Sequence, residues 1–513
     1  MIQRRFVRAV ATVSGLTGLS RILGFVRDVL MASVLGDGRI ADAWHAAFML
    51  PNMFRRTFAE GAMQAAFVPL LRGKLEDASE AEAKLFAKRA FTALLVILVP
   101  LSIALILAMP WLIDGVTRIE PSSDRFELAV IFGRIMFPYL MLMTAMAYIG
   151  SILNTLGRFA PLALAPTMLN VILVALLIWL QQSPSIPGHV LSWGVLVAGF
   201  AQIVVVWVPA RAMGWTPSLA WPFGTGPFLA KMFNGMIAAG GMQISAIIVL
   251  YLASGIEGDL TRLQYANRLF QLPLGIIGIA LNTVLISSLS NLIEKDERQG
   301  ARAQLNRALE LSLLLSIPVA LACAFHADFL FQGLFQVGKF GADASAGAAL
   351  ALVGYAIGIP AAVAQKVLQP AFFARQNTRT PMYHSLAAVA VAVGFSYALY
   401  PSLGIFGLTL AASISAWMGF LSLAIHTGLR GYFTPDQQLI RRLIPMIISA
   451  VLMILALELA LQIIEPSDEW RFQTVRLPLT ITLILLSICL YFGLSLGLRA
   501  TSRADLRNLI GRT

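Results

Sequence analysis

The 513-residue sequence contains only two cysteines and few charged residues. Cys323 and Cys489 both lie in apolar runs, so we expect small core side chains, with no material for a disulfide framework or a metal cluster. Lysine, arginine, aspartate and glutamate make up 12% of the chain, about half the usual share in soluble proteins. This composition excludes an ordinary soluble domain.

The sequence also lacks the motifs of metal-dependent and nucleotide-dependent catalysis. The five histidines are scattered, and no two have the H-x-x-x-H or H-E-x-x-H spacing that holds zinc on a helix. No G-x-x-x-x-G-K-[ST] run is present to bind a nucleotide phosphate. We predict no metal site, no cofactor and no catalytic residue, and hence no enzyme.

Long hydrophobic runs dominate what is present. Hydrophobic residues make up 58% of the chain. About fourteen runs are long enough to cross ~30 Å of hydrocarbon, each with about 20 residues. The fold class that this predicts is an all-α polytopic membrane protein with about fourteen transmembrane helices.

Positive charges gather on alternate loops and predict the orientation of the chain. The formal net charge is +12 at pH 7. If the N-terminus is cytoplasmic, most loop lysines and arginines fall on the cytoplasmic side, as the positive-inside rule expects. This favours an even number of spans with both termini cytoplasmic. It also explains the basic balance without a nucleic-acid partner.

Prolines within the hydrophobic runs indicate an internal repeat. The interval from Pro51 to Pro138 equals the interval from Pro273 to Pro360. Such self-similarity is typical of transporters built from repeated halves. We predict two pseudo-symmetric six-helix lobes and a C-terminal two-helix hairpin, at residues 1–215, 216–432 and 433–513. The prolines either bend helices that line a cavity or only shape the packing.

Several charged side chains fall inside the predicted membrane segments. A lysine or arginine at the membrane centre costs roughly 2.5–3.5 kcal/mol, so those present usually face water or a partner. The set is Arg21, Arg27, Asp28, Asp42, Arg55, Arg56, Glu60, Arg134, Arg268 and Lys366. Most are positive, and a guanidinium offers a planar fork of donors that suits phosphate. We therefore predict a phosphate-binding cavity.

Spacing separates candidate ligands from local ion pairs. Arg21 and Asp28 are seven residues apart and share a helix face, whereas Arg27 joins them only if the cavity is broad or the helix bends near Gly24. Arg55 has no carboxylate three or four residues away, which makes it a candidate ligand. Arg268 has none within a turn either, although snorkelling to a helix end is an alternative for it.

Two acidic residues in the second segment have structural alternatives. Arg56 and Glu60 have the i,i+4 spacing of a helical salt bridge. Asp42 either pairs with a cavity arginine when an outer gate closes or caps its own helix.

Six runs of sequence carry a family resemblance. They are LSRILGFVRDVLMASVLG, ADAWHAAFMLPNMFRRTFAEGAMQAAFVPLL, NTLGRFAPLALAPTMLN, YANRLFQLPLGIIGIALNTVLISSLS, LFQVGKF and PAFFARQNTRTP, in this order between residues 19 and 381. Together they closely resemble the MurJ (MviN) family of lipid II flippases, in the multidrug/oligosaccharidyl-lipid/polysaccharide exporter (MOP) superfamily.

The resemblance implies a fold and a function. The family has fourteen transmembrane helices, with two six-helix lobes around a central cationic cavity and a final hairpin lining a lipid-tail groove. The implied activity flips lipid II from the inner to the outer leaflet of the bacterial cytoplasmic membrane, by alternating access driven by membrane potential or an ion gradient. The implied partners are lipid II and membrane lipids. A monomer is expected, and association with the cell-wall synthesis machinery is an open alternative.

The resemblance also assigns residues. It places substrate-binding arginines on Arg21, Arg27, Arg55 and Arg268. It places the family's first-loop aspartate on Asp42. We predict gating or supporting roles for Asp28, Asp42, Asn52, Glu60, Pro51 and Pro273. Gln271 stands where some relatives have an acidic residue, which puts in doubt any pairing of Arg268 with a neighbouring carboxylate. No carboxylate cluster supports a sodium site, and none is predicted.

Three other functions compete with lipid flipping. An exporter of cationic drugs would need a lone membrane carboxylate, which the arginine surplus disfavours. A membrane enzyme acting on polyprenyl phosphates would need clustered acids or histidines at a membrane edge. A non-transporting scaffold would leave the paired prolines and the charged interior unexplained.

Overall fold

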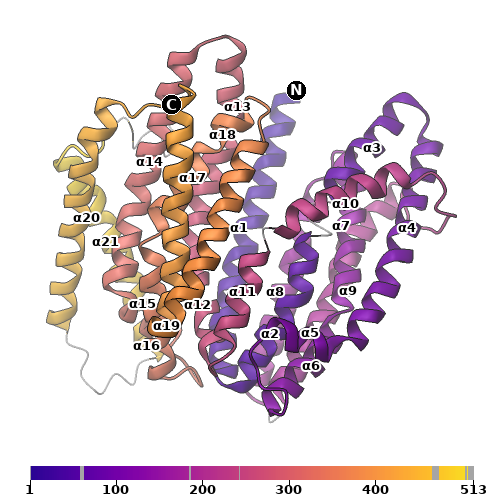
Figure 1. The fold of residues 1–513 in the computed structure, drawn as a ribbon, viewed down its shortest axis with the longest axis horizontal. Helices are drawn as coiled ribbons and strands as arrows, with labels where there is room; N and C mark the ends of the chain where they lie inside the picture. The colour runs from indigo at the N-terminus through magenta and orange to yellow at the C-terminus, as the bar shows by residue number, and fades with distance from the viewer. Residues whose placement is uncertain are drawn as a thin grey trace. The chain divides into compact units, whose positions relative to one another are not determined.

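The computed structural model describes residues 2–57, 63–183, 186–241, 243–464, 473–502 and 505. Within these ranges every regular element is a helix, which confirms the all-α prediction (Figure 1). Helices are the expected result, because backbone groups inside a membrane must form their hydrogen bonds within the segment. Glu60 and its predicted salt bridge with Arg56 lie outside the described residues.

The chain packs as two compact units. The first unit contains Met1–Thr261 and Gly338–Phe340, and the second contains Arg262–Val337 and Gly341–Thr513. These units are defined by packing, whereas the boundary predicted near residue 215 separates two repeated lobes. The units therefore do not test that boundary, and it stays a prediction.

The first unit has a large hydrophobic core. Its helices are α1 (Ile2–Leu35), α2 (Arg39–Arg55), α3 (Met63–Asp77), α4 (Glu80–Leu107), α5 (Met109–Val116), α6 (Asp124–Met136), α7 (Tyr139–Thr155), α8 (Ala160–Leu180), α9 (Pro187–Ala212), α10 (Gly226–Gly241) and α11 (Ile244–Ala253), followed by the start of α12 (Asp259–Pro273). The core buries large rings such as Trp44, Phe132 and Tyr148. Pairs α1 and α8, α2 and α6, and α8 and α9 pack side by side.

The second unit contains the end of α12 and the remaining elements. These are the π-helix η2 (Leu274–Gly278), α13 (Ile279–Glu294), α14 (Arg298–Phe325), α15 (Ala327–Leu334), α16 (Ala342–Ala356), α17 (Ile359–Leu368), α18 (Pro370–Phe373), α19 (Arg379–Leu429), α20 (Gln437–Ile464) and α21 (Gln473–Gly497). α19 consists of two arms joined at Gly404, whose φ of 56° is not helical. α20 packs on α14 and on α21, and α21 packs on α15, so the C-terminal hairpin is attached through α14 and α15 (Figure 1).

Eight described helices are long and apolar enough to cross a membrane. A ninth counts if Ala342–Ala356 and Ile359–Phe373, which are bent by 43° relative to each other, form one span. The polar helices α2 and α12 have only 17 and 15 residues and are not among them. The predicted total of about fourteen spans stays a prediction.

The four repeated prolines lie at or near helix irregularities. Pro273 is the last residue of α12 and is followed directly by η2. Pro138 lies in the turn between α6 and α7, and Pro360 lies in the first turn of α17, next to the 43° bend. Pro51 is inside α2, and residues 56–57 directly after that helix are π-helical. Proline and π-bulges are common causes of such irregularities in helices.

Candidate functional site

Arg27 lies on α1 in a network of polar contacts. Its Nε and Nη2 are 3.1 and 2.7 Å from Asp28 Oδ1, and its Nη1 donates to Asn170 Oδ1 at 3.1 Å. The side chains of Arg27 and Asp28 are only 11% and 8% exposed. A guanidinium has five N–H groups. Three of them donate to the described residues, so up to two remain for an anion.

Asn170 from α8 holds this part of α1 in place. Its amide Nδ2 donates to the backbone oxygen of Ser20 at 2.9 Å. A Cβ added to Gly24 would lie 3.5 Å from the same amide, so the two helices are in contact here. Arg21, within this stretch of α1, has an exposed side chain. Sequence reasoning missed Asn170, although a lone amide inside the apolar run 160–180 is a detectable signal.

Arg55 lies at the C-terminal end of α2 and is oriented by Asn52. Its Nε and Nη2 donate to Asn52 Oδ1 at 3.0 and 2.8 Å. These two hydrogen bonds fix the direction of the guanidinium. Pro51, one residue earlier, is buried, and Arg56 is exposed.

Asp42 connects the start of α2 to the start of α12. Its Oδ2 accepts from the backbone N–H of Gly258 at 2.7 Å, and its Oδ1 accepts from the N–H and hydroxyl of Thr261 at 3.0 and 2.6 Å. Arg125 Nη1 is 3.3 Å from Oδ2, and Arg125 Nη2 donates to the Ser254 oxygen at 2.7 Å. Asp42 is 1% exposed. The carboxylate therefore caps another helix and pairs with an arginine that was not on the membrane list.

Arg268 and Pro273 lie in the second unit, on α12. Arg268 is half-buried, and the neighbouring Gln271 is exposed. After Pro273 the π-helical turn ends at Gly278, where an added Cβ would lie 2.8 Å from Cδ of Lys366. The backbone oxygen of Lys366 also accepts from Asn282 Nδ2 at 3.2 Å. The membrane lysine thus packs directly on the irregular turn.

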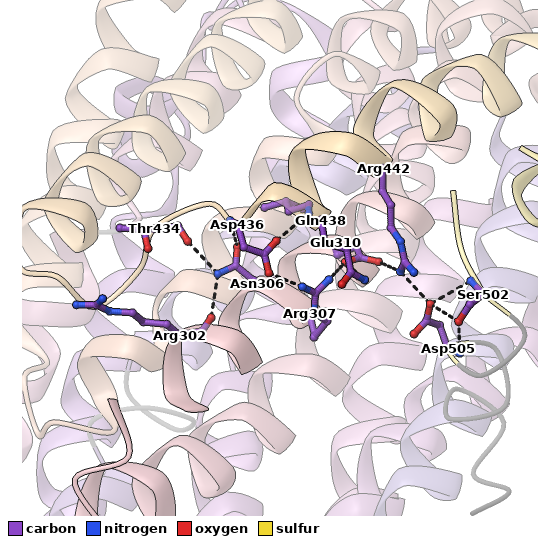
Figure 2. Close-up of polar contacts among 11 residues, drawn as sticks. Arg302, Asn306, Arg307, Glu310, Thr434, Asp436, Gln438, Arg442, Ser502 and Asp505 are labelled. Atoms are coloured by element: carbon purple, nitrogen blue, oxygen red, sulfur yellow. Dashed lines mark hydrogen bonds and ion pairs between the residues drawn. The ribbon is translucent and has the colours of Figure 1, made fainter. Parts of the chain in front are cut away.

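A second polar cluster, which sequence reasoning missed, joins α14, α20 and the C-terminal segment (Figure 2). Glu310 is 6% exposed and forms ion pairs with Arg307 and Arg442. Arg307 also pairs with Asp436, whose Oδ1 accepts from the N–H of Leu439 and so caps α20. Arg442 Nη1 is 2.8 Å from Asp505 Oδ2. The cluster therefore ties the C-terminal hairpin to the rest of its unit.

These arrangements suit anion binding better than metal binding. In the part of the chain that is described, no three His, Cys, Asp or Glu side chains are grouped as a metal site requires. The candidate arginines differ in their exposure and in their hydrogen-bond partners. Arg27 is half-buried and pairs with Asp28, Arg55 is hydrogen-bonded to Asn52, and Arg21 is exposed.

Comparison with known proteins gives consistent matches along most of the chain. A family profile described as "Lipid II flippase MurJ" matches residues 31–488. A probable lipid II flippase MurJ of Rhizobium meliloti (strain 1021) is 35% identical over 515 residues, which cover 99% of this chain and 96% of that protein. The lipid II flippase MurJ of Burkholderia cenocepacia is 32% identical, over 95% of this chain and 96% of that protein.

Solved structures show the same fold at lower identity. A structure of lipid II flippase MurJ in an inward closed conformation is similar with a TM-score of 0.79 and 24% identity, covering 97% of this chain and 99% of that chain. An inward-facing multidrug resistance MATE family transporter of the MOP superfamily is similar with a TM-score of 0.68 and 12% identity, covering 82% of this chain and 98% of that chain.

Proposed function

Because the chain belongs to the lipid II flippase MurJ family, we propose that it moves lipid II from the inner to the outer leaflet of the bacterial cytoplasmic membrane. The cargo is the undecaprenyl-pyrophosphate-linked precursor of peptidoglycan. Family membership along nearly the whole chain carries this proposal. The protein is a transporter of the MOP superfamily, and its role in this proposal is transport without catalysis.

The proposal includes a membrane topology. Fourteen helices cross the membrane, in two six-helix lobes and a C-terminal hairpin, with both termini cytoplasmic. The positive-inside distribution of lysine and arginine supports this orientation. The hairpin α20–α21 presents many exposed apolar side chains, such as Leu455, Leu459 and Leu485, and so suits contact with a polyprenyl tail. The protein acts as a monomer.

Arg21, Arg27, Arg55 and Arg268 bind the diphosphate of the cargo in this proposal. Phosphate oxygens accept paired hydrogen bonds from a guanidinium, and the arginine stays charged at any physiological pH. Asn52 supports the proposal because it directs Arg55 through two hydrogen bonds. Asp28 and Asn170 support it because they hold Arg27 in one orientation.

The transport cycle follows alternating access. The headgroup enters from the cytoplasmic side, its lost hydration is replaced by the arginines, and a conformational change then exposes it outside. The polyprenyl tail remains in lipid throughout. Membrane potential or an ion gradient supplies the driving force.

The test is a lipid II translocation assay in cells depleted of their own flippase. We compare the parent chain with Arg21→Ala, Arg55→Ala, Arg268→Ala and Arg27→Lys at matched membrane levels. Lysine keeps the charge of Arg27 but cannot form the planar fork, and charged hydrogen bonds contribute about 1.5–3 kcal/mol each. We therefore expect translocation by Arg27→Lys to fall about tenfold or more. Arg158→Lys, at an exposed arginine, is the matched control.

The outcomes separate the function from the site. Restored translocation by the parent with failure of the four variants supports both. A well-inserted parent that moves no lipid II contradicts the proposed function. Variants that work as well as the parent and the Arg158→Lys control contradict the arginine site and leave the flippase function in place.

A further inference from the structure

The link between α9 and α10 presents three large apolar side chains. Leu219, Trp221 and Phe223 are 71%, 74% and 70% exposed. The rings of Trp221 and Phe223 are in contact, with centroids 6.2 Å apart, and the N–H of Phe223 donates to the Trp221 oxygen at 2.8 Å. The rings therefore project from a tight turn. Exposed apolar groups gathered in this way mark an interaction surface.

The link is fixed to α4 at two points. The Nζ of Lys84 lies 5.5 Å from the ring centre of Trp215, which is itself 5% exposed. The backbone N–H of Ala220 donates to Thr92 Oγ1 at 3.0 Å. An α-helix rises 1.5 Å per residue, so the link runs about 12 Å along α4 from Lys84 to Thr92.

The sequence of α4 gives the depth that the link reaches. Acidic residues occupy its first turn, the bases Lys84, Lys88 and Arg89 follow, and no charged residue occurs from 90 to 107. Thr92 lies one turn beyond Lys88 and donates to its backbone oxygen at 3.0 Å. Trp221 directly follows the residue bound to Thr92. It is therefore at the level where the charged part of α4 gives way to the apolar span.

The surroundings of the link suit a phospholipid surface. α9 presents the exposed apolar side chains of Val197, Val204 and Val208, and it ends just after the exposed Arg211. The link thus follows, along the chain, a helix with exposed apolar side chains, and the basic Arg211 lies in the last turn of that helix. Tryptophan is enriched at membrane interfaces, and basic residues there attract anionic lipids.

We propose that the link at residues 213–225 is a membrane-interface anchor. Leu219, Trp221 and Phe223 insert among the headgroups of the inner leaflet. The bases Lys88 and Arg89 bind anionic phospholipid headgroups beside them. Because the link leads directly into α10, the anchor fixes the depth at which that helix begins. This role does not depend on the identity of the transported molecule.

The test places a nitroxide label at the anchor in the full-length chain. The native thiols are removed by Cys323→Ala and Cys489→Ser, and Trp221→Cys carries the label. Thr216→Cys, at an exposed position of the same link next to Trp215, is the matched control. Collision rates with oxygen and with a water-soluble nickel chelate are measured in nanodiscs of phosphatidylcholine, with and without phosphatidylglycerol.

We expect the label at 221 to collide more with oxygen and less with nickel than the label at 216. Phosphatidylglycerol should deepen the label at 221, and Lys88→Gln with Arg89→Gln should abolish that shift. Equal accessibility at 221 and 216 would overturn the anchor. A label at 221 that is shielded from both reagents would also overturn it, because a protein partner or a second copy would then cover the link. If the depth of the label at 221 is the same with and without phosphatidylglycerol, the proposed role of the bases is wrong.

Discussion

The carboxylate of Asp42 is almost fully buried, and four donors surround it. Two backbone N–H groups, the hydroxyl of Thr261 and the guanidinium of Arg125 all point at its oxygens. Removing one member of a buried ion pair leaves the other charge uncompensated. We expect Asp42→Asn to reduce the free energy of unfolding by about 3 kcal/mol. Thermal unfolding of the purified chain in detergent would measure the loss.

A second aspartate of the same unit provides the control. Asp124 is 77% exposed and pairs at 3.0 Å with Arg39, which is 59% exposed. Exposed pairs contribute about 0–1 kcal/mol. Asp124→Asn should therefore leave the unfolding temperature nearly unchanged. Equal losses from the two substitutions would show that the buried network around Asp42 is not a source of stability.

At the scale of residues, the sequence identifies the charged side chains of interest, but it does not identify their contacts. The energetic cost of charge in a membrane singled out Arg27, Asp28 and Asp42 without any structure. Their partners Asn170 and Arg125 are distant in sequence and could not be paired in advance. Neighbours on a helix do not normally face each other, yet the long side chain of Arg27 reaches Asp28. Contact with substrate stays a prediction for all four candidate arginines.

At the scale of elements, two glycines allow a close approach to α19: Gly354 on α16 and Gly358 in the turn between α16 and α17. Gly354 and Gly358 are four residues apart, and Ser413 Oγ donates to the Gly354 oxygen at 2.6 Å. A Cβ on Gly358 would lie 2.7 Å from the backbone Cα of Ser413. Small residues let membrane helices pack closely. We expect Gly358→Ala to destabilise the chain by about 1–3 kcal/mol, measured by thermal unfolding in detergent.

Substitution of Gly394, on the first arm of α19, should have the opposite effect on stability. A Cβ there would have no described neighbour within 4 Å. Alanine is favoured over glycine inside a helix by about 0.5–1 kcal/mol. Gly394→Ala should therefore keep or raise the unfolding temperature. If both substitutions lowered it equally, helix packing at Gly358 would not be the cause.

The C-terminal segment is held to α20 by a carboxylate with a shifted pKa. Burial opposes ionisation of Asp505, but hydrogen bonds from Ser502 and the charge of Arg442 outweigh it and lower the pKa of the carboxyl. An unfolded aspartate has a pKa of about 3.9. Stabilisation by this contact is therefore complete at neutral pH and is lost as the pH falls from about 4 through the lowered pKa.

Label mobility would follow this loss. A nitroxide at Leu498→Cys in the chain without native cysteines should become more mobile as the pH falls below about 4. Arg442 also pairs with Glu310, so Asp505→Asn is needed as a control to assign the change to Asp505. That variant should be mobile already at neutral pH. If label mobility depends on pH in the same way in the parent and in Asp505→Asn, the change arises from another group.

The prolines show how far elements could be predicted. Pro138, Pro273 and Pro360 lie at or next to helix breaks, because proline cannot donate a backbone hydrogen bond and clashes with the preceding turn. The form of each irregularity, such as the π-helix after Pro273, could not be predicted, because proline alone does not specify it. The polar cluster of Glu310 was also missed, since its members come from three distant segments.

At the scale of the whole molecule, composition alone predicts the fold class. Hydrophobic residues make up 58% of the chain and form long runs. In a membrane such runs form helices, because the backbone groups must make their hydrogen bonds within the segment. Counting spans is harder, because α2 and α12 are short and polar. Those two helices carry Arg55 and Arg268, so the features that weaken the hydropathy signal are the features assigned to function.

The basic excess and the anionic cargo lead to a prediction about driving force. Each charge that moves across 100 mV changes its energy by about 2.3 kcal/mol, which is a factor of about fifty in an equilibrium. An inside-negative potential either pushes the net negative lipid outward or returns a positive empty site inward. In both cases the cycle runs faster with the inside negative. We expect lipid II movement in proteoliposomes with oriented protein to rise under a potassium diffusion potential of that sign and to fall under the reverse sign. Equal rates for the two signs, with the ionophore present and no other gradient, would exclude the potential and leave an ion gradient as the source.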